Sequence, residues 1–501
     1  MLTLRLTTLA ASAFVLALFP LPLACPAQAT AGAPTPPRSW VDKDTGHRVW
    51  RLSDEPNSGG FYFNVNAYTP DGKQMIYTAP DGIHVMDMAT LKTKLLVANP
   101  PDASGGAGTV HALVVGHKTN SVFFTKTDTS GVNAVYKADT NTGAVRKLVD
   151  LPAKRSIVSV NADETLAAGT YIVGDATGKE YGSNLPAAVA APGATPAPVA
   201  TDNKVASATQ GPHYQPANKG AMMEARLAAR LPLVLFTIRL EKGPKGEKPG
   251  TITTLLHSTD WVNHLLFSPT DPTLLMYCHE GPWQKVDRIW MIHTDGTHNT
   301  LIHKRTMLME IAGHEFWGLD GETIWYDWQF PKGEDFFLAG RNLKTGQRIA
   351  YHMQRDEWSI HFNLTKDLDL FCGDGGDPGQ VAKARDGEWI ELFRPQLVRG
   401  GDGALNSPTF WQPGVFRSEH LVNMSHHNYR EEPNVRFSPD KKLVIFTSNM
   451  FGPSYVFAAE VAKADNPPAA DVQSTPELAR KFNPVDPPSG NRPAAATPRA
   501  R

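Results

Sequence analysis

The stretch FSPTDPTLLMYCH at residues 267–279 and its counterpart FSPDKKLVIFTS at residues 437–448 decide the fold of this chain. Each begins with a polar turn of Ser, Pro and Asp and continues into a run of apolar residues. Pro and Asp favour tight turns, whereas β-branched and aromatic residues favour strands. The motif therefore predicts two strands joined by a short turn.

Related turns recur along most of the chain. They lie at residues 69–72, 116–118, 161–163, 268–271, 319–321, 365–367 and 438–440. Several units continue into a third and a fourth strand, as in NAVYKADTNTGAVRKLV at residues 133–149. A four-stranded unit that recurs every roughly 40 to 50 residues is typical of a β-propeller blade. The sequence predicts an all-β fold, a seven-bladed β-propeller of four-stranded antiparallel blades over residues 40–463.

Two segments depart from the repeat. Residues 184–215 are rich in Pro and Ala and predict a flexible insertion, and AMMEARLAAR at residues 221–230 predicts one short helix after it. The composition of residues 464–501 predicts a disordered tail.

The N-terminus resembles an export signal. An apolar run extends from Leu9 to Leu23, and small residues follow up to Ala29. This pattern predicts that residues 1–29 are a signal peptide and that the mature protein, which begins near Thr30, is periplasmic or secreted. Cys25 is an alternative acceptor for a lipid anchor.

The composition excludes some classes of partner. The chain has 501 residues, with 49 Lys and Arg against 50 Asp and Glu. Because charges of neither sign predominate, we expect no nucleic-acid partner, and no membrane partner beyond the possible lipid at Cys25.

Ionisable residues concentrate among tryptophans in CHEGPWQKVDRIW at residues 278–290 and IAGHEFW at residues 311–317. A solvated surface would carry more Lys and Glu and fewer Trp, so these stretches indicate a site at the mouth of the scaffold. The candidate residues are His279, Glu280, Arg288, His314, Glu315 and Trp317.

The repeat also predicts how the histidines are placed. Counting back six residues from the turns leads to His264, His314, His361 and Asn434. Equivalent positions on successive blades lie around one axis, so we expect these side chains to converge at one end of the central channel. The alternative is that each is a separate polar residue on the channel wall.

A metal site is the second expectation. The run NMSHHNYREEPNVRFSPD at residues 423–440 supplies Asn423, His426, His427, Glu431, Glu432 and Asn434. Together with His361 they predict a divalent cation, for which oxygen ligands favour Mn or Ca over structural Zn. Adjacent histidines point apart, so at most one of the pair is a ligand, and His427 is preferred because it lies nearer the inner strand. A hydrogen-bonded polar loop is the alternative.

Other chemistries find little support. No G-x-S-x-G or Walker motif is present, and GDGGD at residues 373–377 is interpreted as a turn. Cys278 and Cys372 are interpreted as small buried residues. A glycoside hydrolase with two of Glu280, Glu315 and Glu432 as paired carboxylates stays open, and so does a non-catalytic binding or scaffold propeller.

The motifs CHEGPWQKVDRIW, GHEFW, SIHFNLTKDLDLFCGDGGD and EPNVRFSPD resemble the oligogalacturonate lyases over about residues 45–462. The resemblance implies a seven-bladed propeller that uses Mn²⁺ to cleave short pectin fragments by β-elimination, giving unsaturated or 4-deoxy-5-keto uronate products. It departs from the family in the export signal, and also at residues 423–427, where the family has a Q-x-x-H-x-H run.

The resemblance also implies residue roles. His314 of GHEFW matches the family's Brønsted base, Arg288 of VDRIW its catalytic arginine, and His361 of SIHFN a metal-ligand histidine. The expected substrate-binding residues are His279, Glu280, Trp317, His264 and Asn64. We therefore expect catalysis by His314 and Arg288, and a metal held by His361, His427 or His426, and Asn423.

Overall fold

The repeated turn motif forms hairpins because its own side chains satisfy the backbone of the turn. In the motif at residues 267–279, Ser268 Oγ accepts the N–H of Asp271 at 3.1 Å, and Asp271 Oδ1 accepts the N–H of Thr273 at 2.8 Å. In the motif at residues 437–448, Ser438 Oγ donates to Asp440 Oδ1 at 2.7 Å. These local hydrogen bonds turn the chain back on itself, and the apolar run that follows pairs with the strand before the turn.

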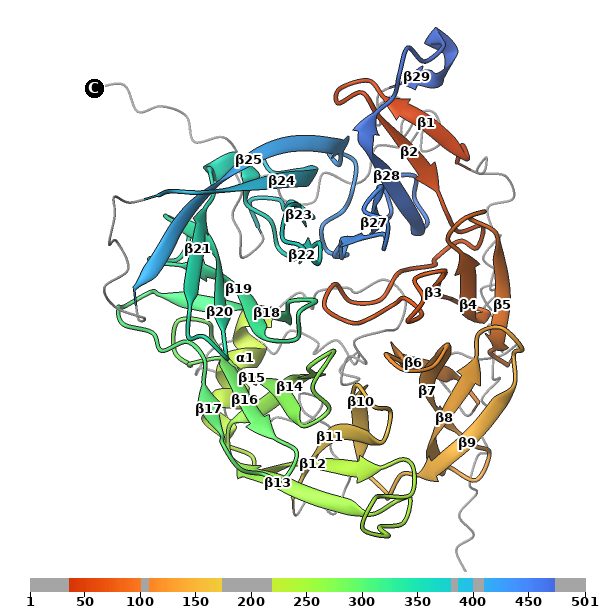
Figure 1. Cartoon of the computed structure of the whole chain (residues 1–501), viewed down its shortest axis with the longest axis vertical. Coiled ribbons are helices and arrows are strands. Elements are labelled where there is room, and N and C mark those ends of the chain that lie inside the picture. Colours follow the sequence, from red (N-terminus) through yellow and green to blue (C-terminus); the bar gives the residue numbers. More distant parts are fainter. Residues whose placement is uncertain (1–35, 101–107, 174–218, 380–385, 400–409, 474–501) are drawn as a thin grey trace, which may run out of the picture. The chain divides into compact units, whose positions relative to one another are not determined.

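A computed structural model describes residues 36–100, 108–173, 219–379, 386–399 and 410–473. The predicted all-β fold is confirmed, since the described residues form six hydrogen-bonded sheets and one α-helix. In Figure 1 the sheets follow one another around a common centre.

Five of these sheets are built as follows. One sheet contains β3 (Gln74–Ala79), β4 (Gly82–Asp87) and β5 (Thr93–Ala98), and the next contains β6 (Val110–Val115), β7 (Ser121–Thr127), β8 (Asn133–Asp139) and β9 (Val145–Asp150). The third contains β10 (Ser156–Val160), β11 (Leu166–Ile172), β12 (Leu233–Arg239) and β13 (Ile252–Ser258), and the fourth contains β14 (Trp261–Phe267), β15 (Leu274–Glu280), β16 (Ile289–His293) and β17 (Thr300–Leu301). The fifth has eight strands: β18 (Ile311–Trp317), β19 (Thr323–Gln329), β20 (Phe336–Asn342), β21 (Arg348–His352), β22 (Phe362–Leu364), β23 (Phe371–Gly373), β24 (Trp389–Leu397) and β25 (Trp411–Asn423). The eight-stranded sheet is two four-stranded antiparallel units, joined where β21 and β25 pair in parallel.

The sixth sheet joins the two ends of the described chain. Its strands are β26 (Arg436–Phe437), β27 (Leu443–Ser448), β28 (Tyr455–Lys463), β2 (His47–Arg51), β1 (Ser39–Asp42) and β29 (Val472–Gln473). β2 pairs antiparallel with β28, so early and late segments share one ladder of backbone hydrogen bonds. This pairing ties together strands more than 400 residues apart in the sequence.

Apolar side chains fill the space between neighbouring sheets. The largest cluster of buried residues runs from Leu52 through Phe124 and Trp325 to Ala458, and so includes members of most sheets. Cys278 and Cys372 are free thiols and fully buried, as the sequence indicated.

Two inner strands carry an irregularity that shapes the centre. The pairing of β14 with β15 shifts register after Asn263, and that of β18 with β19 shifts after Gly313. The residues that follow, His264 and His314, have positive φ angles of 49° and 45°. A bulge of this kind re-aims the side chain of the residue that it contains.

The structure describes some of the segments that lie outside the repeat. The predicted helix is present as α1 (Lys219–Ala229), and the short 3-10 helices are Arg355–Glu357 and Ala469–Asp471. Within the predicted tail, Val472 and Gln473 pair with β1, so order extends beyond residue 463. The predicted signal peptide, Cys25, the insertion at 184–215 and the rest of the tail lie outside the described residues. Among the described residues, no helix has the length and apolar character needed to cross a membrane.

Candidate active site

His361 lies at the centre and is held by a buried carboxylate. Its ring Nδ1 is 2.8 Å from Asp374 Oδ2, and its backbone N–H donates to Asp374 Oδ1, also at 2.8 Å. Both side chains are fully buried. Because a carboxylate only accepts hydrogen bonds, Nδ1 carries the proton and Nε2 presents a lone pair.

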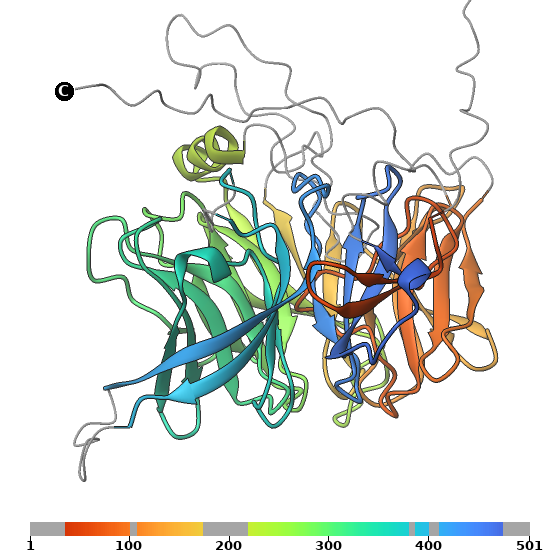
Figure 2. The ribbon, with the colours of Figure 1, turned by 90° about the horizontal axis from the view of Figure 1, so that it is seen from above.

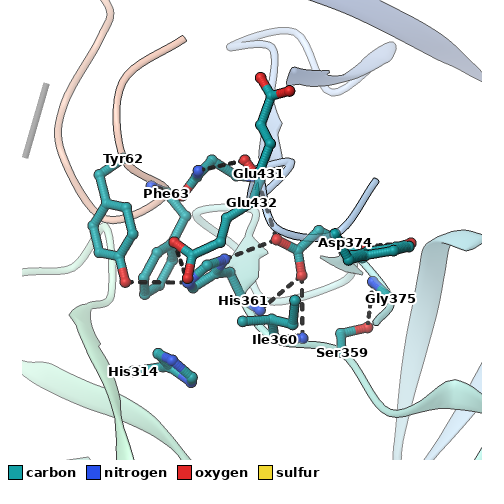
Figure 3. Close-up of polar contacts among 12 residues, drawn as sticks. Tyr62, Phe63, His314, Ser359, Ile360, His361, Asp374, Gly375, Glu431 and Glu432 are labelled. Atoms are coloured by element: carbon teal, nitrogen blue, oxygen red, sulfur yellow. Dashed lines mark hydrogen bonds and ion pairs between the residues drawn. The ribbon is translucent and has the colours of Figure 1, made fainter. Parts of the chain in front are cut away.

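The Nε2 lone pair of His361 faces two oxygen-bearing side chains. The hydroxyl of Tyr62 is 3.1 Å from Nε2, and Glu432 Oε2 is 3.7 Å from the same nitrogen (Figure 3). The ring also stacks on Phe63, with centroids 4.4 Å apart. Burial and the negative charge of Glu432 raise the pKa of Tyr62 well above its ordinary value, so its hydroxyl stays protonated and acts as the donor.

His314 lies beside His361, with ring centroids 4.9 Å apart. Its Nδ1 is 3.6 Å from Asp327 Oδ1, which is too long for a good hydrogen bond. Burial lowers the pKa of His314 below its usual value of 6.5, although the charge of Asp327 opposes this. The imidazole is therefore neutral near neutral pH and able to accept a proton.

An ion-pair network occupies the neighbouring strand ends. Glu280 lies between His264 Nε2 at 2.8 Å and a guanidinium nitrogen of Arg288 at 3.3 Å. Burial by itself would raise the pKa of Glu280, but His264 and Arg288 outweigh it and hold that pKa well below its usual range. Glu280 is therefore ionised, which makes it a poor general acid and disfavours a glycosidase that would use it as one.

We define the central cluster as Tyr62, His264, Glu280, Arg288, His314, Glu315, His361 and Glu432. Within the described residues, several of its buried polar atoms have no hydrogen-bond partner. They are Nδ1 of His314, Nε of Arg288 and Oε2 of Glu315. Buried polar atoms are normally satisfied, so these atoms indicate a place for a polar ligand or water.

The structure brings together most of the residues that the repeat placed at equivalent positions. His264 approaches Tyr62 with ring centroids 6.0 Å apart, and Tyr62 contacts His361. Asn434 also has a positive φ, of 57°, and its backbone N–H donates to Asp374 Oδ2 at 3.2 Å. Asn64 lies at the edge of the cluster, where its amide donates to the backbone oxygen of Glu315 at 3.0 Å.

The predicted ligands at residues 423–427 do not join this cluster. His427 is buried with both ring nitrogens engaged, Nδ1 with Ser448 Oγ at 3.1 Å and Nε2 with the backbone oxygen of Glu431 at 2.8 Å. Asn423 binds the carboxylate of Asp44 at 2.8 Å. His427 Nε2 donates to a backbone oxygen and its Nδ1 accepts from the Ser448 hydroxyl, and among the described residues no carboxylate forms an ion pair with this ring. Asn423 is tied to the turn between β1 and β2. The adjacent His426 is half-buried.

Two predicted substrate-binding residues have other roles. The Trp317 indole donates to the backbone oxygen of Leu266 at 2.9 Å and packs among buried residues between β14 and β18. His279 is directed to Asp260, whose Oδ1 is 3.4 Å from its Nε2. Side chains alternate along a strand, so His279 on β15 faces away from Glu280.

The sequence analysis missed Tyr62, Asp327 and Asp374, and it placed Glu432 in the candidate metal cluster without choosing it as a ligand. Asp374 was interpreted as part of a turn. A lone acidic residue within the largely aromatic run TIWYDWQ was the available signal for Asp327, but only the sheet register shows that it lies opposite Gly313.

Few protein ligands are available for a metal. In the described part of the chain, no three residues among His, Cys, Asp and Glu are placed to hold one ion. The pair that does fit is the Nε2 lone pair of His361 with the carboxylate of Glu432. Asp374 behind His361 completes the carboxylate–histidine arrangement that commonly supports a metal-bound imidazole.

The sheets surround a centre that holds buried histidines, carboxylates and an arginine. Side chains of these types are suited to acid–base chemistry. Residues 244–464, which contain most of the central cluster, match the family described as oligogalacturonate lyase. The predicted resemblance to this family is thus confirmed over that region.

Curated relatives agree with this match. The chain is 27% identical over 218 residues to an oligogalacturonide lyase of Pectobacterium atrosepticum, covering 42% of this chain and 53% of the relative. It is 26% identical over 226 residues to an oligogalacturonate lyase of Dickeya dadantii, covering 43% and 53%. The chain therefore spans about half the length of the curated relatives that it matches.

Solved structures extend the likeness to most of the fold. An oligogalacturonate lyase in complex with manganese has a TM-score of 0.60 and 19% identity, covering 85% of this chain and 96% of that one. An oligogalacturonate lyase from Vibrio parahaemolyticus matches with the same values. At this identity the likeness establishes the fold alone.

Proposed function

We propose that this protein is a metal-dependent lyase that cleaves short oligogalacturonides, or related uronic-acid oligosaccharides, by β-elimination. The observation that carries the proposal is a buried His314 of lowered pKa beside His361, with the ring of Trp283 in contact with both His314 and Arg288. These residues all lie in the region that matches the oligogalacturonate lyase family.

His314 is the base in this proposal. The C5 proton of a uronide is weakly acidic, and a neutral imidazole can accept it near neutral pH. The C4–O4 bond then breaks, a C4=C5 double bond forms, and the departing oxygen takes up a proton. Asp327 near Nδ1 stabilises the imidazolium that results.

Arg288 is the electrostatic partner. Its guanidinium is buried and already bound to Glu280 and to the backbone oxygen of Gly281 at 3.0 Å. Its Nε has no partner within the described residues, so it is available for the substrate carboxylate or for charge on the departing O4.

We further propose that His361 and Glu432 hold a divalent cation, with Mn²⁺ the first candidate. One imidazole and one carboxylate suit Mn²⁺ and leave positions for water and substrate oxygens. A cation there would stabilise the charge that develops on the uronide carboxylate. The manganese complex of the similar structure supports this choice.

The proposed fold in full is a seven-bladed propeller. The eight-stranded sheet contains two four-stranded antiparallel units, and counting these separately adds one unit to the six sheets. Electron density or an experimental structure that shows six or eight units would contradict this count.

The proposed activity is tested on purified protein with a panel of galacturonide and other uronide oligomers, with added Mn²⁺ or with a chelator. We expect ultraviolet absorbance from the unsaturated uronide to rise only when a divalent cation is present. New reducing ends without that absorbance would indicate a hydrolase. Binding of the oligomers without any cleavage would favour the non-catalytic binding module.

A further inference from the structure

The helix α1 lies in a connection between two strands of one sheet and packs against residues of the neighbouring sheets. It lies in the connection between β11 and β12, whose ends pair at Ile172 and Leu233. Figure 2 shows α1 above the ends of the sheets. Met223 of α1 is buried against Trp283 and Ile311, which belong to the units that carry the central cluster. The connection between β11 and β12 therefore contacts the sheets that carry the central cluster.

Charged contacts fix the helix in this place. The guanidinium of Arg226 lies 3.6 Å from the ring centroid of Trp261, and Glu224 pairs with Lys285 at 2.8 Å. Arg230, just after the helix, pairs with Asp260. An aromatic–cation contact and two ion pairs along one helix define its position and rotation.

Trp283 connects α1 to the central cluster. Arg288 lies over its ring at 4.0 Å, and the ring of His314 is 4.8 Å away. A Cβ at Gly313 would come within 2.0 Å of the Trp283 ring, so the indole packs directly on the backbone beside His314. The face of α1 that carries Met223 is thus one side chain away from the proposed base.

Lys219 is on that face. It is the first residue of α1 and precedes Met223 by four positions, and residues four apart lie on the same side of a helix. Its charge acts on both Glu280 and His314 and lowers the pKa of each, although it is not the largest influence on either. Within the described residues no carboxylate forms an ion pair with Lys219.

We propose that Lys219 is a substrate-binding residue that pairs with the carboxylate of the uronic acid next to the one that is cut. This rests on the proposed function. An oligogalacturonide carries a carboxylate on every sugar, and the central cluster with its cation accounts for one of them. A second substrate carboxylate beside the central cluster needs its own positively charged partner. The ammonium of Lys219, on a long flexible side chain, can supply it.

The helix lies outside residues 244–464, the region that matches the family. The residue that recognises the neighbouring sugar is therefore supplied by the connection between β11 and β12. Its effect is on specificity: an oligomer long enough to reach Lys219 binds more tightly than one that ends before it.

The test compares Lys219→Met and Lys219→Arg with the unchanged protein. Binding of di- and trigalacturonate is measured by calorimetry in the presence of Mn²⁺, and KM and kcat are measured separately. We expect Lys219→Met to weaken the binding of both oligomers, since a dimer already carries the neighbouring carboxylate, and to raise KM by about tenfold with kcat little changed, because a partly buried charge pair is lost. Lys219→Arg should restore most of the affinity.

Lys344→Met is the matched control, because it removes an exposed lysine that pairs with Glu322 on the surface. It should leave both affinities unchanged. Equal affinity of the unchanged protein and Lys219→Met for the trimer would overturn the inference. If no uronide is cleaved by the unchanged protein, the proposed activity fails, but the calorimetric comparison still decides the role of Lys219.

Discussion

Two histidines that the sequence assigned to one metal site have opposite surroundings. His361 uses Nδ1 to bind Asp374 and turns Nε2 towards Tyr62 and Glu432. His427 is equally buried, but one of its nitrogens binds Ser448 and the other a backbone oxygen. Burial of a histidine is therefore no guide to its role. What differs is that the Glu432 carboxylate lies near the second nitrogen of His361, whereas among the described residues no carboxylate forms an ion pair with His427.

Burial lowers the pKa of His427 to about 4, and its hydrogen bond to Glu431 and the charge of Asp374 oppose this only in part. His361 has the Asp374 carboxylate in direct contact. An imidazole supported in this way is suited to hold a cation, whereas His427 is suited to crosslink the segment that precedes β26.

The largest expected effect comes from His314→Asn. Asn accepts the positive φ of this position better than most residues, so the backbone should be retained while the base is lost. We expect the turnover of galacturonide to fall by about 10² to 10⁴ with metal content unchanged. Ultraviolet absorbance of the product and elemental analysis measure the two quantities.

The pH profile provides the complementary result. The pKa of His314 lies below its ordinary 6.5, so the neutral form persists into mildly acidic solution, and kcat/KM should decline only below that value. A variant that keeps more than about a tenth of the turnover would remove His314 from the mechanism. His264 would then be the nearest alternative, since His279 faces away from the cluster.

A smaller effect is expected for Asp374→Asn. The variant keeps the size of the side chain but loses the charge that supports His361, and such changes cost about 10- to 100-fold in metal affinity or activity. Titration with Mn²⁺ followed by calorimetry measures the affinity. Glu391→Gln is a matched control, because Glu391 is a buried carboxylate 2.8 Å from His420 outside the central cluster. An equal loss in both variants would contradict the role given to Asp374.

The smallest effect on the metal is expected for His427→Gln, which should leave Mn²⁺ affinity unchanged. Its effect is on stability. The folded pKa of about 4 lies below the unfolded value, so neutral His427 contributes stability that is present above about pH 6.5 and is lost as the pH falls towards 4.

We therefore expect the stability advantage of the unchanged protein over His427→Gln to narrow by up to about 3 kcal/mol across this range, since one pKa unit corresponds to about 1.4 kcal/mol. Urea unfolding at several pH values measures the difference. A loss of metal affinity in His427→Gln would show that His427 is a metal ligand, as the sequence predicted.

Local signals in the sequence predicted much of the fold. The motif around Ser268 and Asp271 forms a hairpin because its hydrogen bonds lie within a few residues of each other, and the repeat of such turns indicated successive sheets. The position six residues before each turn also placed His264, His314 and His361 correctly around one centre. The helix near residues 221–230 followed from composition alone.

Long-range pairings could not be predicted in the same way. Trp317 belongs to a motif rich in functional residues, yet its indole is fixed by Leu266 on another strand and serves the core. Asp327 and Asp374 gained their roles from sheet register and from the approach of distant loops. Neither kind of contact leaves a pattern in the neighbouring sequence.

The sequence by itself determined where strands begin and turn, and which residue types could reach the centre, because these depend on contacts between near neighbours. The tertiary structure alone decided which imidazole has a carboxylate near each of its nitrogens, and that α1 reaches the cluster from another sheet. These depend on atoms brought within hydrogen-bonding distance by packing between sheets, as Tyr62 is to His361 across 299 residues of chain.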